Sequence, residues 1–111
     1  MSGTARVLGA SLIVVLVASC GGSTVPLERL VNRQDRYAGQ VVTTEGMVSS
    51  FQEPDGTTSY ILEDEAQNRV LLLPADAAAT HLGESVEVTG LFDFDPERGR
   101  TLMVQTWRPG G

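Results

Sequence analysis

An apolar run that ends at the chain's only cysteine divides the sequence into a leader and a body. The run extends from Val7 to Val17, broken by one glycine and one serine, and follows a single basic residue, Arg6. Its length suits the core of a secretory signal peptide and falls short of the roughly 20 residues that span a bilayer. An uncleaved signal anchor, the alternative, needs a longer run. We therefore expect residues 1–19 to be a signal peptide.

The end of the run, Leu16-Val17-Ala18-Ser19-Cys20, resembles the bacterial lipobox, in which an aliphatic residue is followed by two small residues and a cysteine. In lipoproteins with this motif the cysteine sulfur receives a diacylglycerol, and the signal is cut just before it. The resemblance implies a lipid on Cys20, a flexible tether over residues 20–24, and an extracytoplasmic address at a cell membrane or outer membrane. Two or three acyl chains anchor stably, whereas one binds only reversibly.

The rest of the chain is strongly acidic. All fourteen carboxylates lie after position 20, against seven arginines and no lysine, which gives a formal charge of −7. An acidic surface repels phosphate backbones, so we expect no nucleic-acid partner. The same net charge gives no overall attraction to anionic lipids. With a single cysteine no disulfide can form within the chain, so its stability has to come from packing.

The body is expected to contain five short strands and two short helices. Strands are predicted by apolar residues at alternate positions, over residues 42–48, 58–63, 69–73, 85–92 and 101–107. Helices are predicted over residues 25–31, capped by Ser23 or Thr24, and over residues 74–82, closed by Gly83. No long helix alternates with the strands, which excludes a doubly wound parallel sheet.

Two of these strands share a spacing of glycines. Gly39-x-x-Val42-x-Thr44-x-Gly46-x-Val48 matches Gly83-x-x-Val86-x-Val88-x-Gly90-x-Phe92, although the flanking residues differ too much for a full repeat. Glycine inside a strand marks a sharp bend or a close approach of another backbone. We therefore expect both strands to be curved strands of a small barrel.

These motifs resemble exported bacterial OB-fold proteins of the tRNA-anticodon-binding-like type. The resemblance rests on Tyr37-Ala38-Gly39 through Val48, on Leu62-Glu63-Asp64, and on Gly83 through Gly90. It implies an all-β domain with short helices, a small five-stranded OB-fold-like barrel over residues 25–108, and no catalytic residue. The competing architecture is a small β-sandwich.

OB folds bind ligands on the face of strands two and three, between the loops that join strands one to two and four to five. Those loops are expected at residues 49–57 and 93–100. Aromatic and arginine side chains could stack on or pair with a ligand there, and the candidates are Phe51, Tyr60, Arg69, Phe94, Arg98 and Arg100. For Tyr60, and for Phe92, the simpler interpretation is a core residue, and Trp107 is expected to plug one end of the barrel.

Carboxylates at Asp93, Asp95 and Glu97 resemble the start of a calcium-binding loop, although Arg98 stands where the EF-hand has glycine. The alternative is a solvated hairpin loop, and Glu63-Asp64-Glu65 is likewise expected to be a solvated turn. A zinc site needs three or four nitrogen or sulfur ligands, and His81 is the only histidine. We expect no cofactor and no enzymatic activity.

The function expected from the sequence is non-catalytic binding or assembly at the cell envelope. Its partners would be the membrane, through the lipid, and an envelope protein. The alternative is a small-molecule or cation-binding envelope protein that uses the acidic loop at residues 93–99.

Replacing the sulfur that carries the lipid tests the anchor. Cys20→Ser should release the protein from membranes, because a serine hydroxyl does not replace the thiol in lipid transfer. Membrane fractionation and the intact mass, which should lose the lipid adduct, check this prediction. Unchanged membrane association of the variant would contradict it.

Overall fold

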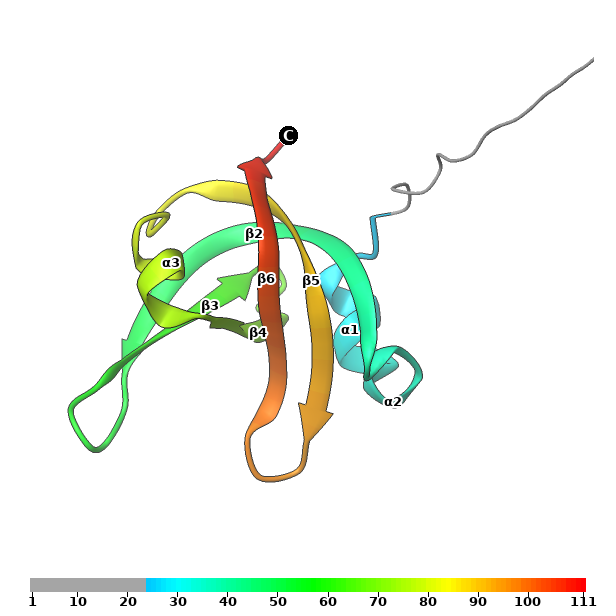
Figure 1. Cartoon of the computed structure of the whole chain (residues 1–111), viewed down its shortest axis with the longest axis horizontal. Helices are drawn as coiled ribbons and strands as arrows, with labels where there is room; N and C mark the ends of the chain where they lie inside the picture. The colour runs from blue at the N-terminus through cyan, green and yellow to red at the C-terminus, as the bar shows by residue number, and fades with distance from the viewer. Residues whose placement is uncertain (1–23) are drawn as a thin grey trace, which may run out of the picture.

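The computed structural model describes residues 24–111, in which five strands form a barrel with three short helices around it (Figure 1). In chain order these elements are α1 (Leu27–Asn32), α2 (Gln34–Tyr37), β2 (Gln40–Gln52), β3 (Thr58–Glu63), β4 (Arg69–Leu73), α3 (Ala75–Ala79), β5 (Ser85–Asp95) and β6 (Gly99–Pro109). The proposed signal peptide and Cys20 lie outside the described residues.

The strands close in the order β2-β3-β4-β6-β5. Neighbouring strands are antiparallel except for β4 and β6, which run parallel. The predicted fold class, an all-β domain with short helices and a five-stranded OB-fold-like barrel, is confirmed. A β-sandwich is excluded, because the sheet closes on itself.

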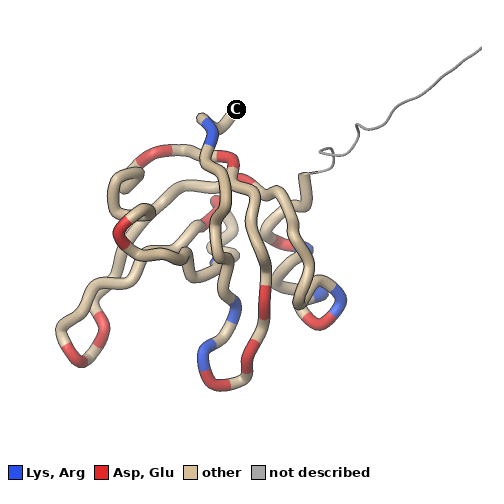
Figure 2. Tube along the Cα trace, in the orientation of Figure 1, with Lys and Arg blue, Asp and Glu red and all other residues tan. Residues whose placement is uncertain are grey.

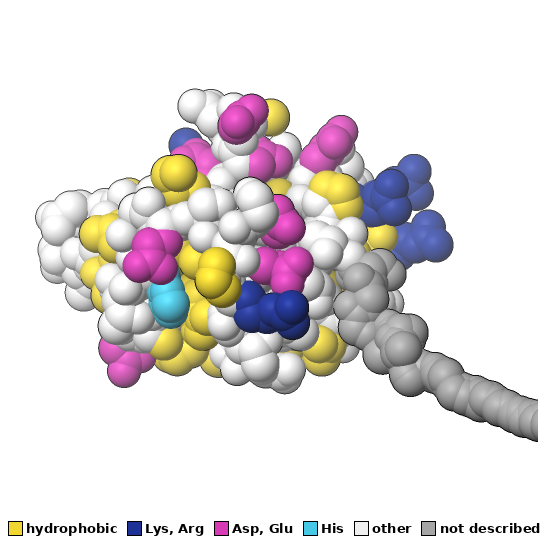
Figure 3. All heavy atoms as spheres, turned by 90° about the horizontal axis from the view of Figure 1, so that it is seen from above, with side chains coloured by type: hydrophobic (Ala, Val, Ile, Leu, Met, Phe, Trp, Pro, Cys, Tyr) yellow, Lys and Arg dark blue, Asp and Glu magenta, His cyan; other side chains and the backbone are white. Residues whose placement is uncertain are grey.

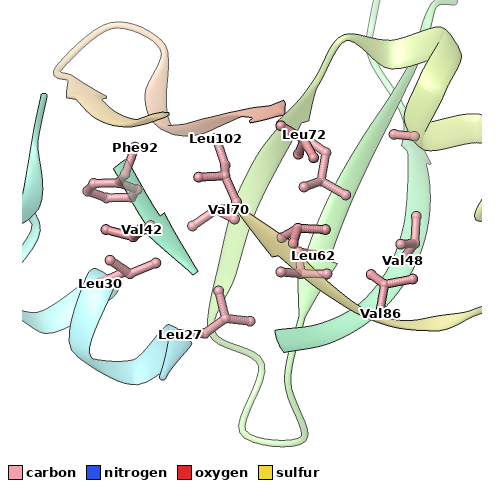
Figure 4. Close-up of a cluster of buried hydrophobic side chains, with 13 residues drawn as sticks. Leu27, Leu30, Val42, Val48, Leu62, Val70, Leu72, Val86, Phe92 and Leu102 are labelled. Atoms are coloured by element: carbon pink, nitrogen blue, oxygen red, sulfur yellow. The ribbon is translucent and has the colours of Figure 1, made fainter. Parts of the chain in front are cut away.

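Apolar side chains from all five strands and from α1 and α3 fill the barrel (Figure 4). Leu27 and Leu30 of α1 are both buried, as the three-residue spacing on one helix face predicts. Ala78 of α3 is fully buried in the same cluster, and Figure 1 shows α1 and α3 on opposite sides of the barrel. Phe92 is fully buried, as expected of a core residue.

Strand lengths differ from the prediction in the hairpins. β3 and β4 have the predicted bounds, but β2 continues to Gln52, so its loop to β3 spans only residues 53–57. β5 continues to Asp95 and β6 begins at Gly99, which shortens the loop between them to residues 96–98. The expected loops at 49–57 and 93–100 were therefore too long. These hairpin arms are largely exposed to solvent, so their residues carry little hydrophobic alternation even though the backbone ladder continues.

The helices are shorter than predicted. α1 begins after Pro26, which occupies the cap position and has no polar side chain to cap the helix. Thr24, one of the two predicted caps, forms a parallel bridge with Thr43. α3 ends at Ala79, since the chain turns over residues 80–83 to reach β5. The four residues of α2 were not predicted as a helix. None of them is buried, so they show no helical periodicity.

The two strands with matching glycines are neighbours, and their pairing has a local two-fold symmetry. Thr44 lies opposite Val88 at the centre of the β2–β5 ladder. At one end the Gly39 N–H donates to the Phe92 carbonyl, and at the other the Gly83 N–H donates to the Val48 carbonyl, both at 2.8 Å. The repeated spacing therefore reflects two strands that use equivalent positions to pair with each other.

The central glycines of these strands allow close approach of the next strand on each side. A Cβ atom on Gly46 would lie 2.9 Å from the Glu63 carbonyl oxygen of β3. A Cβ atom on Gly90 would lie 2.2 Å from the Met103 carbonyl oxygen of β6, next to a register shift between Thr89 and Gly90. Of the two interpretations of a glycine inside a strand, a sharp bend or a close approach of another backbone, these contacts show the close approach at both positions.

A buried hydroxyl at the centre of this ladder generates a stability prediction. The Thr44 side chain is fully buried, and its Oγ1 has no hydrogen-bond partner among the described residues. Thr44→Val should raise the free energy of unfolding by about 1 kcal/mol, because an unpaired hydroxyl is replaced by a methyl group of similar size. Urea unfolding measures the change.

The matched control is Thr43→Val, on the outer side of the same strand. The Thr43 Oγ1 shares a hydrogen bond of 2.7 Å with the Thr89 Oγ1, so this variant should give no gain. A clear loss of stability in Thr44→Val would show that the Thr44 hydroxyl has a partner and would contradict the prediction.

Candidate interaction surface

The structure brings some of the candidate ligand-binding residues together, namely Arg69, Phe94 and Arg100, but it does not place all six on one surface. Phe51 lies exposed near the end of β2, opposite Ser59. Tyr60, the next residue of β3, points to the other side of the sheet and packs against the core. Its interpretation as a core residue is the one that agrees with the structure.

The arginines of this group make structural contacts. The Arg69 Nε donates to the Glu63 carboxylate across the β3–β4 pair at 2.6 Å. Arg100 donates to the Arg69 carbonyl at 3.2 Å and to the Gln34 side chain of α2 at 3.0 Å, which connects β6 to β4 and α2.

The remaining two candidates lie in the β5–β6 hairpin. Phe94 is half-buried and lies directly opposite Arg100, and Arg98 is exposed in the turn. A shared ligand site for Phe51, Tyr60, Arg69, Phe94, Arg98 and Arg100 stays a prediction, and the arrangement of these side chains does not favour it.

A different surface stands out on the outer side of β2, β5 and β6. Val41 pairs with Leu91, and Leu91 pairs with Met103, so three exposed apolar side chains form one row across three strands. Their exposed fractions are 57%, 40% and 46%. On β4, the half-buried Leu73 pairs with Met103 and extends the row.

A row of threonines runs beside the apolar row. Thr43 and Thr89 are cross-strand neighbours with hydrogen-bonded hydroxyls, and Thr89 pairs with Thr106. We call the two rows together the neutral face, which comprises Val41, Thr43, Thr89, Leu91, Met103 and Thr106. It carries no charged side chain, in a chain whose body has a formal charge of −7.

Charges begin where the neutral face ends. One position further along the strands Glu45 lies opposite Glu87, and the Arg108 Nε approaches the Glu87 carboxylate at 3.6 Å. On the other side, Asp93 follows Leu91 at the next outward position of β5. An uncharged centre with charged residues at its rim is the composition typical of protein–protein interfaces.

The neutral face is not among the surfaces predicted from the sequence, although the sequence carries a signal for it. Val41-Val42, Leu91-Phe92 and Met103-Val104 are consecutive apolar pairs in strands that otherwise alternate. Such a pair makes both sides of the sheet apolar at that point. The pairs indicated an apolar outer surface, but only the register of the barrel shows that the outward members lie side by side.

A second surface feature is a groove of about 430 Å³ with an acidic lining. Its residues are Glu45, Gly46, Met47, Ser49, Glu63, Asp64, Glu65 and Ser85. Glu63 is paired with Arg69, and Asp64 holds the β3–β4 turn by accepting hydrogen bonds from Asn68 and Ala66. Part of this acidic lining therefore serves the local structure.

The carboxylates of the β5–β6 hairpin also act locally. Asp93 accepts a hydrogen bond from the Phe94 N–H at 2.9 Å, and Asp95 accepts one from the Glu97 N–H at 2.7 Å. Within residues 24–111 no three His, Cys, Asp or Glu side chains are grouped so that they could hold a metal ion. The geometry thus gives no support to the predicted calcium loop of Asp93, Asp95 and Glu97.

The single histidine takes part in packing. The His81 ring stacks on Trp107 with ring centroids 4.4 Å apart, and its Nδ1 lies 2.9 Å from the Glu84 carboxylate. Trp107 is half-buried and packs against the core, in agreement with its expected role as a packing residue. This stack joins the turn after α3 to the last strand.

The hydrogen bonds of Asp64 predict a pH-dependent contribution to stability. Partial burial raises the pKa of the Asp64 carboxyl, but hydrogen bonds from the Asn68 side chain and from the Asn68 and Ala66 N–H groups outweigh it, so the pKa lies below its ordinary value. Asp64→Asn should lower the free energy of unfolding at neutral pH by about 1 kcal/mol or less. Because the folded pKa is lowered, the stabilisation is present above the ordinary pKa of about 3.9 and is lost as the pH falls through the folded value. Urea unfolding should show a smaller difference in unfolding free energy between the wild-type protein and Asp64→Asn below pH about 3 than at neutral pH. The same difference at both pH values would contradict this account.

Comparisons with known proteins assign no function to the chain. No protein-family model matches the chain, and no curated protein matches it significantly. Among the surfaces of the described residues, the neutral face gives the strongest support for a functional assignment.

Proposed function

We propose that this protein is a lipid-anchored binding module of the cell envelope whose neutral face contacts an envelope protein. The observation that carries the proposal is the exposed row Val41, Leu91 and Met103 on the outside of an otherwise acidic barrel. The largest contiguous apolar patch on the surface of a protein is often a site of interaction.

The shape of the neutral face favours a protein partner. It lies on the outer side of β2, β5 and β6, where Val41 pairs with Leu91 and Leu91 pairs with Met103. What it presents to a partner is therefore a row of neighbouring side chains. Apolar side chains beside threonine hydroxyls offer both a surface that excludes water and groups that form hydrogen bonds at its edge.

The anchor is supported by the sequence motif that ends at Cys20. The net negative charge of the body gives no overall attraction to anionic lipids, so attachment to a membrane would depend on the acyl chains. Within residues 24–111 no helix is long and apolar enough to cross a membrane.

A binding role, as opposed to catalysis, is supported by how the titratable groups are used. Asp64 fixes a turn, His81 stacks on Trp107, and Glu63 pairs with Arg69. The alternative of cation binding by the acidic loop is not favoured by the geometry, because within residues 24–111 no three His, Cys, Asp or Glu side chains are grouped so that they could hold a metal ion.

Crosslinking in native membranes tests the proposal. The full chain should form a specific adduct with an envelope protein. Leu91→Gln and Met103→Gln should each reduce the adduct about tenfold or more, because a polar group replaces an apolar one at the centre of the contact. Quantitative mass spectrometry of the crosslinked species measures the effect.

The matched control is Leu82→Gln, which changes a leucine of similar exposure, 51%, that lies outside the neutral face. This variant should keep the adduct, and all three variants should unfold at similar temperatures. Equal yields of adduct from all three variants would contradict the proposal that the neutral face contacts the partner. A thermal shift with metal ions or sugars, in the absence of any adduct, would favour the small-molecule alternative.

A further inference from the structure

Three arginines border a single hollow beside α1 and α2. Arg29 lies in α1, Arg33 joins α1 to α2, and Arg36 lies in α2. All three are exposed, and together with Tyr37 they line a hollow of about 250 Å³. Several basic positions lie together on this segment in Figure 2. We call Arg29, Arg33 and Arg36 the arginine cluster.

No member of the arginine cluster forms an ion pair within residues 24–111. One carboxylate, Glu28, lines the neighbouring hollow with Arg29 and Arg33, and Asp35 is close in sequence. By contrast, Arg69 and Arg108 each lie beside a carboxylate, and Arg100 donates two hydrogen bonds. Three positive charges that share a hollow repel one another, so an anion in that hollow would relieve the repulsion.

The position of the cluster indicates where the anion comes from. Pro26 directly precedes α1 and lines a neighbouring hollow with Arg29 and Arg33, so the cluster adjoins the start of the described chain. In Figure 3, arginine side chains project on the side of the domain where that chain begins. The four residue steps from Cys20 to Thr24 can span at most about 14 Å. A lipid on Cys20 would therefore hold this end of the domain close to the headgroups.

We propose that the arginine cluster binds the phosphate groups of anionic phospholipids in the membrane to which Cys20 is attached. This inference rests on the proposed lipid anchor. The planar guanidinium group of arginine matches the oxygens of a phosphate with two parallel hydrogen bonds, and three such groups around one hollow form a site for an anionic headgroup. The lipid supplies the attachment, and the cluster fixes which end of the domain faces the bilayer.

Hydrogen exchange on the full lipidated chain tests the site. The chain is reconstituted into vesicles of phosphatidylcholine alone or of phosphatidylcholine with phosphatidylglycerol, and exchange is followed over residues 26–38. Exchange should be slower in the anionic vesicles. Arg33→Gln should reduce this protection about fivefold, the effect of losing one basic residue near a charged surface. The triple variant Arg29→Gln, Arg33→Gln and Arg36→Gln should abolish it.

The matched control is Arg98→Gln, which removes an exposed arginine from the tip of the β5–β6 hairpin and should leave the protection unchanged. Equal exchange in both kinds of vesicle, with lipid found on Cys20 by mass spectrometry, would overturn this inference and leave the anchor standing. Protection by inorganic phosphate together with equal exchange in the two kinds of vesicle would assign the site to a soluble anion and overturn the lipid assignment. An intact mass without lipid would overturn the anchor, and this inference with it.

Discussion

The pairing of β2 with β5 is the constraint on which the rest of the structure depends. It closes the barrel, and it forces β3 and β6 close to Gly46 and Gly90, where no side chain fits. The same register sets the inward residues, with Thr44 opposite Val88 at the centre of the ladder. It also determines which outward side chains are neighbours. The neutral face on the outside of the barrel therefore depends on the same register as the core.

The core of this fold could be predicted because burial leaves a local signal. The bounds of β3 and β4 follow from short apolar runs, and the glycine spacing pointed to the close contacts around Gly46 and Gly90. Solvated elements leave no such signal, which is why the hairpin arm beyond Val48 and the short α2 were missed. The neutral face could not be predicted for a different reason. Val41 and Leu91 are fifty residues apart, and only the long-range register brings them together.

The two proposed surfaces adjoin without sharing a residue. The Gln40 side chain donates to the Arg36 carbonyl at 2.9 Å, so the first residue of β2 connects the arginine cluster to the strand that carries Val41. If both proposals hold, the domain turns its α1–α2 end toward the bilayer and presents the neutral face beside it. A partner attached to the same membrane could then meet that face. The acidic hairpins, which headgroups would repel, lie on other parts of the barrel (Figure 2).

Oxidative footprinting of two methionines tests the central claim, that the neutral face is covered in the cell envelope. Met103 lies in the neutral face and Met47 outside it, with similar exposed fractions of 46% and 52%. In the purified protein both should be oxidised by hydroxyl radicals at similar rates. In native membranes Met103 should be oxidised several-fold more slowly while the rate for Met47 stays the same. Equal rates for the two methionines in native membranes would contradict the account.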